Sequence, residues 1–137
     1  MTDYTAILYK LKEILDEIEN TFVFVEIPRQ GDTPGAEVGI FMDSEENEEH
    51  TIGSDNPYLT HLNIEIVCQD FSPDGVGEAC RKRDALVGKV RDLLKVNRDI
   101  GGLVGSSQIG RITFETAQGA AGFYSAASIP LRGILFS

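Results

Sequence analysis

The sequence predicts an α+β domain, with a mostly antiparallel sheet of about five strands and two helices packed on one face, in the order α-β-β-β-α-β-β. Three observations support this class. Two segments repeat apolar residues at helical spacing, other segments alternate apolar and polar residues, and turns rich in Gly and Pro separate them. With 137 residues, of which 42% are hydrophobic, the chain can fill one core, and we expect residues 1–137 to form a single domain.

The first predicted helix lies near the N-terminus. Its apolar residues recur every three or four positions and therefore form one stripe. They are Tyr4, Ile7, Leu8, Leu11, Ile14, Leu15 and Ile18. Thr2 or Asp3 precedes the stripe, and either side chain is suited to cap the first turn.

Two strands are expected next. Residues 21–27 have β-branched or aromatic side chains at both odd and even positions, which is typical of a strand buried on both faces. Pro28 ends this run. Residues 36–42 alternate apolar and polar side chains, as a half-exposed strand does. The simplest pairing of the two is a β-hairpin with a loop of about seven residues.

Residues 43–57 carry six acidic side chains and no Lys or Arg, so we expect a mobile, solvated acidic loop. After it, Leu62, Ile64, Ile66 and Cys68 alternate with polar residues and predict a third strand with one buried face. Residues 72–75 supply the turn that ends it.

A second amphipathic helix is predicted over about residues 77–96. Its outward face is basic and carries Arg81, Lys82, Arg83, Lys89, Arg91 and Lys95. Residues 106–116 and 123–136 then predict two strands around a Gly-rich turn, and Pro130 points to an edge or a bulge in the last one. Two helices cover only one face of such a sheet, so the other face stays open to solvent or to a partner.

The charge distribution narrows the possible functions. The net charge is −10, which disfavours a nonspecific clamp on nucleic-acid phosphates. Residues 1–75 carry a net −14 and residues 76–137 a net +4. No apolar run is long enough to span a membrane, and the N-terminal residues lack the pattern of a secretory signal, so we expect a cytoplasmic product with reduced thiols.

We expect the chain to have no cofactor, no bound metal and no enzymatic activity, because its candidate catalytic and metal-binding motifs are incomplete. Asp43, Glu45, Asn47 and Glu49 alternate as calcium ligands do, but Glu48 stands where an EF-hand loop requires Gly. A solvated charge run is therefore favoured. Two histidines, His50 and His61, and two cysteines, Cys68 and Cys80, lack metal-ligand spacing, and both thiols fit core positions.

The segregated charges suggest self-assembly. If copies pack head to tail in a ring, the basic helix of one copy can lie against the acidic loop of the next. We therefore expect two groups of interface residues. They are Glu45, Glu46, Glu48 and Glu49 in the loop, and Arg81, Lys82 and Arg83 on the helix.

The whole-chain order resembles the tail terminator (tail completion) proteins of long-tailed bacteriophages. The resemblance rests on the N-terminal helix, the hairpin, the long polar loop, the strand over residues 61–68 and the helix over residues 83–94. The C-terminal part fits too, with residues 109–115, a Gly-rich turn and a closing strand over residues 129–136.

The resemblance implies a homohexameric ring that sits on the last ring of tail-tube protein, stops tube growth and offers a docking surface to the head–tail connector or neck protein. It implies a virion location at the head–tail junction, assembly in the host cytoplasm, and DNA that passes through the lumen without specific binding. It transfers no catalytic residue.

Two alternatives stay open. One is a head-side neck or head-completion protein of the same particle, which differs only in the ring that it caps. The other is a small α+β enzyme or ligand-binding domain, with His61 or the acidic loop in a cleft.

Overall fold

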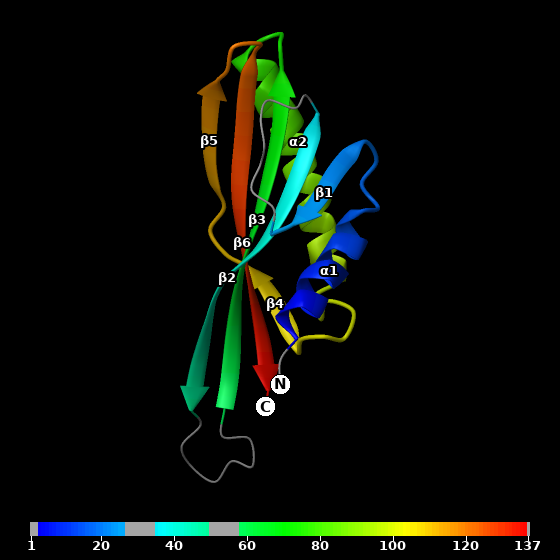
Figure 1. The fold of residues 1–137 in the computed structure, drawn as a ribbon, viewed down its shortest axis with the longest axis vertical. Helices are drawn as coiled ribbons and strands as arrows, with labels where there is room; N and C mark the ends of the chain where they lie inside the picture. The colour runs from blue at the N-terminus through cyan, green and yellow to red at the C-terminus, as the bar shows by residue number, and fades with distance from the viewer. Residues whose placement is uncertain (1–2, 27–34, 50–57, 137) are drawn as a thin grey trace.

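A computed structural model describes residues 3–26, 35–49 and 58–136. The α+β class is confirmed, because these residues form two helices and six strands (Figure 1). In chain order the elements are α1 (Tyr4–Leu15), β1 (Thr21–Val25), β2 (Ala36–Glu49), β3 (Tyr58–Ser72), α2 (Val76–Val96), β4 (Ser106–Ile109), β5 (Thr113–Gln118) and β6 (Phe123–Phe136).

One mixed sheet contains all six strands. The strand order is β1-β2-β3-β6-β4, and β5 pairs with the other part of β6. Every pairing is antiparallel except that of β1 with β2, which is parallel. The three long central strands cross the whole molecule, whereas β1, β4 and β5 each cover only part of its length (Figure 1).

The sheet therefore has two halves, named here as they appear in Figure 1. In the upper half, β1 and β5 are the outer strands, and they flank residues 36–40, 66–72 and 123–128 of the central strands. In the lower half, residues 43–49 of β2 and strand β4 are the outer strands. Pro130 lies between the β6 residues that pair with β5 and those that pair with β4. Neither strand pairs with Pro130 itself, so its missing N–H removes no ladder hydrogen bond on the β4 and β5 side of β6.

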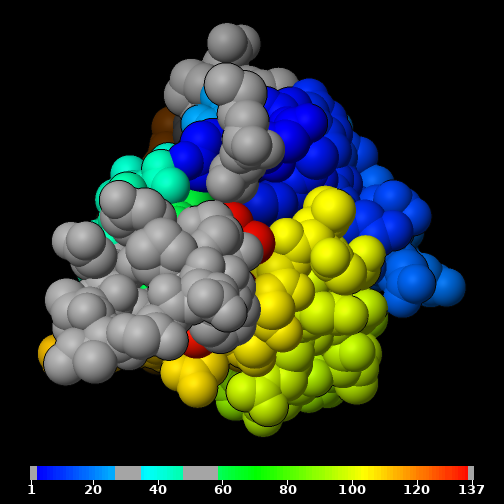
Figure 2. Space-filling view, turned by 90° about the horizontal axis from the view of Figure 1, so that it is seen from below, coloured from blue at the N-terminus to red at the C-terminus, as the bar shows by residue number. Residues whose placement is uncertain are grey.

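Both helices pack on the same face of the sheet, as predicted. A single core joins the buried stripes of α1 and α2 to alternate residues of the strands, among them Val38, Ile40, Ile66 and Ile129. Figure 2 shows α1 (dark blue) and the segment that follows α2 (yellow) side by side at the lower end of the molecule. The opposite face, called the open face below, carries the strand residues that alternate with these core residues.

The helices begin close to the predicted positions, but α1 ends at Leu15, before Ile18, the last residue of its predicted stripe. Asp3 is the N-cap of α1, and its carboxylate accepts a hydrogen bond of 2.9 Å from the Ala6 N–H. Helix α2 spans Val76–Val96 against a prediction of 77–96. No helix in the described ranges is long and apolar enough to cross a membrane.

The predicted hairpin of the first two strands is wrong. β1 runs parallel to β2, with Thr21 opposite Ala36 and Val25 opposite Ile40, so the two strands cannot be joined by a simple hairpin turn. β1 is also an edge strand rather than a strand buried on both faces, because 65% of the Phe22 surface is exposed. Phe24 is nevertheless buried, since it lies over Gly39 and against the ring of Phe41.

Two further expectations need correction. Residues 43–49, expected in the acidic loop, continue strand β2 and pair with β3 as far as Glu49 and Tyr58. Residues 50–57, the rest of the expected loop, lie outside the described residues. The segment 106–116 was expected as one strand, but it forms β4 and β5, because the chain leaves the ladder at residues 110–112 beside Pro130.

Candidate self-assembly surfaces

The acidic part of β2 forms an open edge of the lower half-sheet. β1 pairs with β2 only as far as Ile40, and the Met42 N–H donates to the Glu26 carboxylate at 2.7 Å. Beyond Met42, the described residues give β2 a strand neighbour on one side only, which is β3. The outer edge of residues 43–49 thus presents unpaired backbone groups, in a segment whose sequence has five acidic residues.

The glutamates predicted as interface residues follow one another along this edge. Glu45 is opposite Leu62 and accepts a hydrogen bond from the Tyr4 hydroxyl, and this bond raises the pKa of Tyr4 above its ordinary value. Glu46 is opposite His61 on the open face. Glu48 and Glu49 continue the strand towards its end.

Glu46 belongs to a polar network on the open face. Its carboxylate lies 3.4 Å from the Arg132 guanidinium and accepts from the Asn63 amide at 3.4 Å, and that amide also donates to the Ser44 hydroxyl at 2.9 Å. About half or more of the Glu46 and Arg132 side chains is exposed, so the ion pair adds little to stability. Glu46 therefore keeps an exposed charge that a neighbouring molecule can contact.

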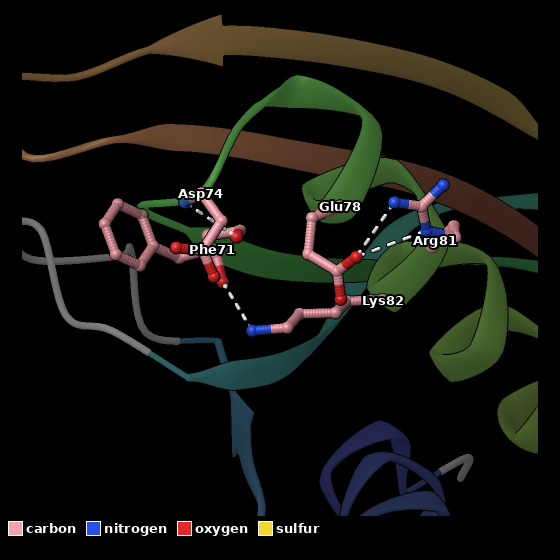
Figure 3. Close-up of polar contacts among 6 residues, drawn as sticks. Phe71, Asp74, Glu78, Arg81 and Lys82 are labelled. Atoms are coloured by element: carbon pink, nitrogen blue, oxygen red, sulfur yellow. Dashed lines mark hydrogen bonds and ion pairs between the residues drawn. The ribbon is translucent and has the colours of Figure 1, made fainter.

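The three predicted basic interface residues at the start of α2 have different surroundings. Arg81 points outwards, with 75% of its side chain exposed, and pairs with Glu78 at 3.0 Å. The Lys82 ammonium donates to the Phe71 carbonyl oxygen at 3.4 Å, beside the turn that holds Asp74 (Figure 3). Of these two, Arg81 offers the more exposed cation, and neither is buried.

Arg83 is turned towards the sheet. Its guanidinium donates to the Ser125 hydroxyl at 2.7 Å, pairs with Asp84 at 2.9 Å and lies 4.7 Å from the centre of the Phe114 ring. Only 12% of the side chain is exposed. Arg83 thus links α2 to β5 and β6 within one molecule.

A second basic region lies at the other end of α2, beside edge strand β4. Lys95 and Arg98 line a groove of about 490 Å³, whose other walls are Leu94, Ser107, Gln108, Ile109 and Leu131. Arg98 is tied to β4, because the Ser107 hydroxyl donates to the Arg98 carbonyl oxygen at 2.7 Å. Sequence reasoning assigned no interface role to this region, although the positive balance of the C-terminal half is a signal of it.

The strand register places this basic region level with the acidic edge. Gln108 on β4 pairs with Arg132, Arg132 with Asn63, and Asn63 with Ser44 on β2. The acidic edge and β4 thus flank the same four-stranded part of the sheet, on opposite sides. The basic residues at the start of α2 lie elsewhere, beside the upper ends of β3 and β6.

The residues with possible catalytic or metal-binding roles are dispersed. His61 is half-buried in β3, opposite Glu46 and Ile134, and His50 lies outside the described residues. Cys68 is fully buried in the core, as predicted, and burial raises its pKa to about 12. Cys80 is half-buried, and its sulfur accepts a hydrogen bond from the Ser125 hydroxyl at 3.7 Å.

Within the described ranges, no group of three or more His, Cys, Asp or Glu side chains is arranged to hold a metal ion. What these ranges do contain is an acidic edge and a basic edge at one level of the sheet. Such an arrangement suits contact between copies of the chain. No protein-family model and no curated protein sequence matches the chain.

Proposed function

We propose that the chain is a structural subunit of a bacteriophage tail: a tail terminator that forms a ring on the end of the tail tube, stops its polymerisation and provides the docking surface for the head connector. The observation that carries the proposal is the pair of oppositely charged edges in the lower half-sheet. One edge is acidic, at residues 43–49, and the other is β4 with Lys95 and Arg98 beside it.

Edges on opposite sides of one sheet favour a head-to-tail contact. If neighbouring copies are related by rotation about an axis roughly parallel to the strands, the acidic edge of one copy meets β4 of the next. The two strands would then run antiparallel, because β2 and β4 point in opposite directions in each copy. Antiparallel pairing is the slightly more stable kind, and the opposite charges would fix which edges meet.

We propose that the open face of the lower half-sheet lines the lumen of this ring. In the lower half, that face carries Glu46 with Arg132, and Glu65 lies further up β3, where it accepts from the Ser128 hydroxyl at 3.0 Å. A lumen with exposed carboxylates would repel DNA phosphates and let DNA pass without binding. The ends of the ring would be the surfaces for the tail tube and the connector.

The first test is the mass of the protein in solution. We expect light scattering on a sizing column to show a closed ring, near six copies, which becomes smaller as salt rises from about 0.1 M to about 1 M. Over that range the Debye length falls from about 10 Å to about 3 Å, so charge pairing between copies weakens. A monomer at every concentration, with and without tail tubes, would overturn the proposal.

Charge reversal then tests the contact itself. Lys95→Glu with Arg98→Glu should abolish the ring, and Arg81→Glu should leave it intact, because Arg81 lies at the other end of α2. Both variants change exposed cations, so circular dichroism should show the wild-type fold in each. Loss of the ring in the Arg81 variant alone would instead support the helix-start contact expected from the sequence.

The position in the particle needs a separate test. Purified protein is mixed with growing tubes of the tail-tube protein from the same virus and imaged by negative-stain electron microscopy. We expect rings at one end of each tube and shorter, uniform lengths. Rings on the portal of isolated heads, with free tube ends, would favour the neck protein instead.

A further inference from the structure

Among the described residues, the upper half-sheet also ends on each side in a strand with a strand neighbour on one side only, and one of these two edges carries an apolar groove. Strand β1 forms one edge, and the groove of about 300 Å³ runs between this strand and α1. Tyr9 and Phe22, both in the groove wall, are 55% and 65% exposed. Lys12 and Asp16 lie at the rim, but they pair with each other at 2.8 Å, so the rim offers little net charge.

The opposite edge of the same half is β5. All six of its residues are exposed, and Phe114 is 53% exposed although it is one of the larger apolar side chains. A row of paired residues crosses the sheet from Val23 through Val38, Cys68 and Ala127 to Phe114. Phe114 and the groove are therefore at the same level, on opposite sides of one sheet.

We propose that the groove beside β1 receives strand β5 of a neighbouring copy. This inference rests on the proposed ring and adds a second contact to it, in the upper half-sheet. The occupant follows from the twist of the sheet. In Figure 1, the lower part of β2 and β5 lie on one side of the molecule, and β4 and β1 lie on the other, so the rotation that brings the two lower edges together also brings β5 of one copy towards β1 of the next. Strand directions again make the pair antiparallel.

The side chains are complementary in this arrangement. Phe114 lies on the helix side of β5, as shown by its contact with Arg83 from α2. Tyr9 extends from α1, which packs on the same side of the sheet as α2. An added β5 strand would therefore bring Phe114 towards the exposed ring of Tyr9. The β5 residues that alternate with Phe114 would face Phe22. The contact would cover two exposed aromatic surfaces and pair the open edges.

The first experiment compares edge variants by light scattering. Phe22→Asp should abolish the ring, and so should Phe114→Ser or Thr116→Lys on the other side of the contact. The control is Val76→Asp, because Val76 is 46% exposed at the start of α2 and belongs to none of the four strand edges in the two proposed contacts. Circular dichroism and thermal melts identify any variant that fails to fold, and Thr116→Lys keeps the test valid if Phe114→Ser unfolds.

Mixing the variants tests the direction of the contact. Phe22→Asp keeps an intact β5, and Thr116→Lys keeps an intact groove, so an equimolar mixture should form a one-to-one complex although each variant alone is a monomer. Assembly blocked by Phe22→Asp but not by either β5 variant would indicate a β1–β1 contact and overturn the proposal. Rings unaffected by Phe22→Asp would also overturn it, and the groove would then serve a different partner.

A peptide probe separates this inference from the ring itself. A fluorescent peptide spanning residues 111–119 should bind the wild-type protein and bind Phe22→Asp at least about tenfold more weakly, a difference of about 1.4 kcal/mol. Peptide binding by a protein that stays monomeric would support the groove and contradict the ring. A ring that is sensitive to Lys95→Glu with Arg98→Glu, with no peptide binding and no effect of Phe22→Asp, would support the ring and contradict the groove.

Discussion

The guanidinium of Arg83 lies 4.7 Å from the centre of the Phe114 ring, and this contact joins helix α2 to edge strand β5. β5 otherwise pairs only with β6 among the described strands, and all of its residues are exposed. The same guanidinium donates to the buried Ser125 hydroxyl at 2.7 Å. Arg83 thus holds in place the strand that the neighbouring copy is proposed to receive.

Replacing Arg83 should therefore destabilise the fold. Arg83→Ala removes a cation–π contact and a charge-assisted hydrogen bond to Ser125, and we expect a loss of about 2 kcal/mol in the free energy of unfolding. Arg81→Ala is the matched control, because Arg81 is on the same helix, 75% exposed and paired only at the surface, and it should cost less than about 0.5 kcal/mol. Urea denaturation measures both, and equal effects would refute the structural role of Arg83.

Two glycines should respond in opposite ways to alanine. A Cβ on Gly39 would lie 2.7–2.8 Å from ring atoms of Phe41 and Phe24, so Gly39→Ala should displace these rings and cost about 1–3 kcal/mol. A Cβ on Gly88, in α2, would meet nothing within 4 Å, and Gly88→Ala should stabilise the protein by up to about 1 kcal/mol. Thermal denaturation of the two variants distinguishes them, and a stabilised Gly39→Ala would contradict the packing described here.

The helices and the third strand could be predicted from sequence because their periodicity is determined locally. The apolar stripe of α1, the alternation over Leu62, Ile64 and Ile66, and the apolar face of α2 each reflect one face turned to a core. The direction of β1 could not be predicted. Its apolar residues would suit a parallel or an antiparallel neighbour equally well, and the choice depends on how α1 packs against the sheet.

The surroundings of the candidate interface residues were harder to predict, because neighbouring side chains of one type can point in different directions. Arg81 and Arg83 are two positions apart on a helix, so one faces solvent and the other faces the sheet. Likewise, carboxylates in a row indicate a solvated segment, but they do not distinguish a loop from an edge strand such as residues 43–49. Only the tertiary arrangement brings β4 level with that edge.

The cap of α1 provides a further prediction. The Asp3 carboxylate accepts from the Ala6 N–H at 2.9 Å and satisfies one of the unpaired donors of the first turn. Asp3→Ala should cost about 1 kcal/mol, whereas Asp3→Asn should cost much less, because asparagine caps helices about as well. Chemical denaturation gives the two values, and an equal loss in both variants would show that the charge of Asp3, rather than its capping geometry, stabilises the helix.

The Cys68 thiol should be unreactive and should make stability depend on pH in the alkaline range. Burial raises its pKa to about 12 from an ordinary value of 9.0, so the folded protein keeps the thiol protonated where the unfolded chain loses the proton. The contribution of Cys68 to stability is therefore complete below about pH 9 and is lost as pH rises from there towards 12. With a thiol reagent at pH 8, we expect Cys68 to react only after unfolding, because the thiolate is the reactive form.

Cys68→Ala is the control for this titration. It should lower stability at neutral pH by removing a fully buried side-chain atom, and it should also flatten the decline in the free energy of unfolding between about pH 9 and pH 11. Mass spectrometry of modified peptides separates Cys68 from the half-buried Cys80. Rapid modification of Cys68 in the folded protein would mean that the core around β3 opens readily. The row of paired residues that runs through Cys68 from β1 to β5 would then not be rigid.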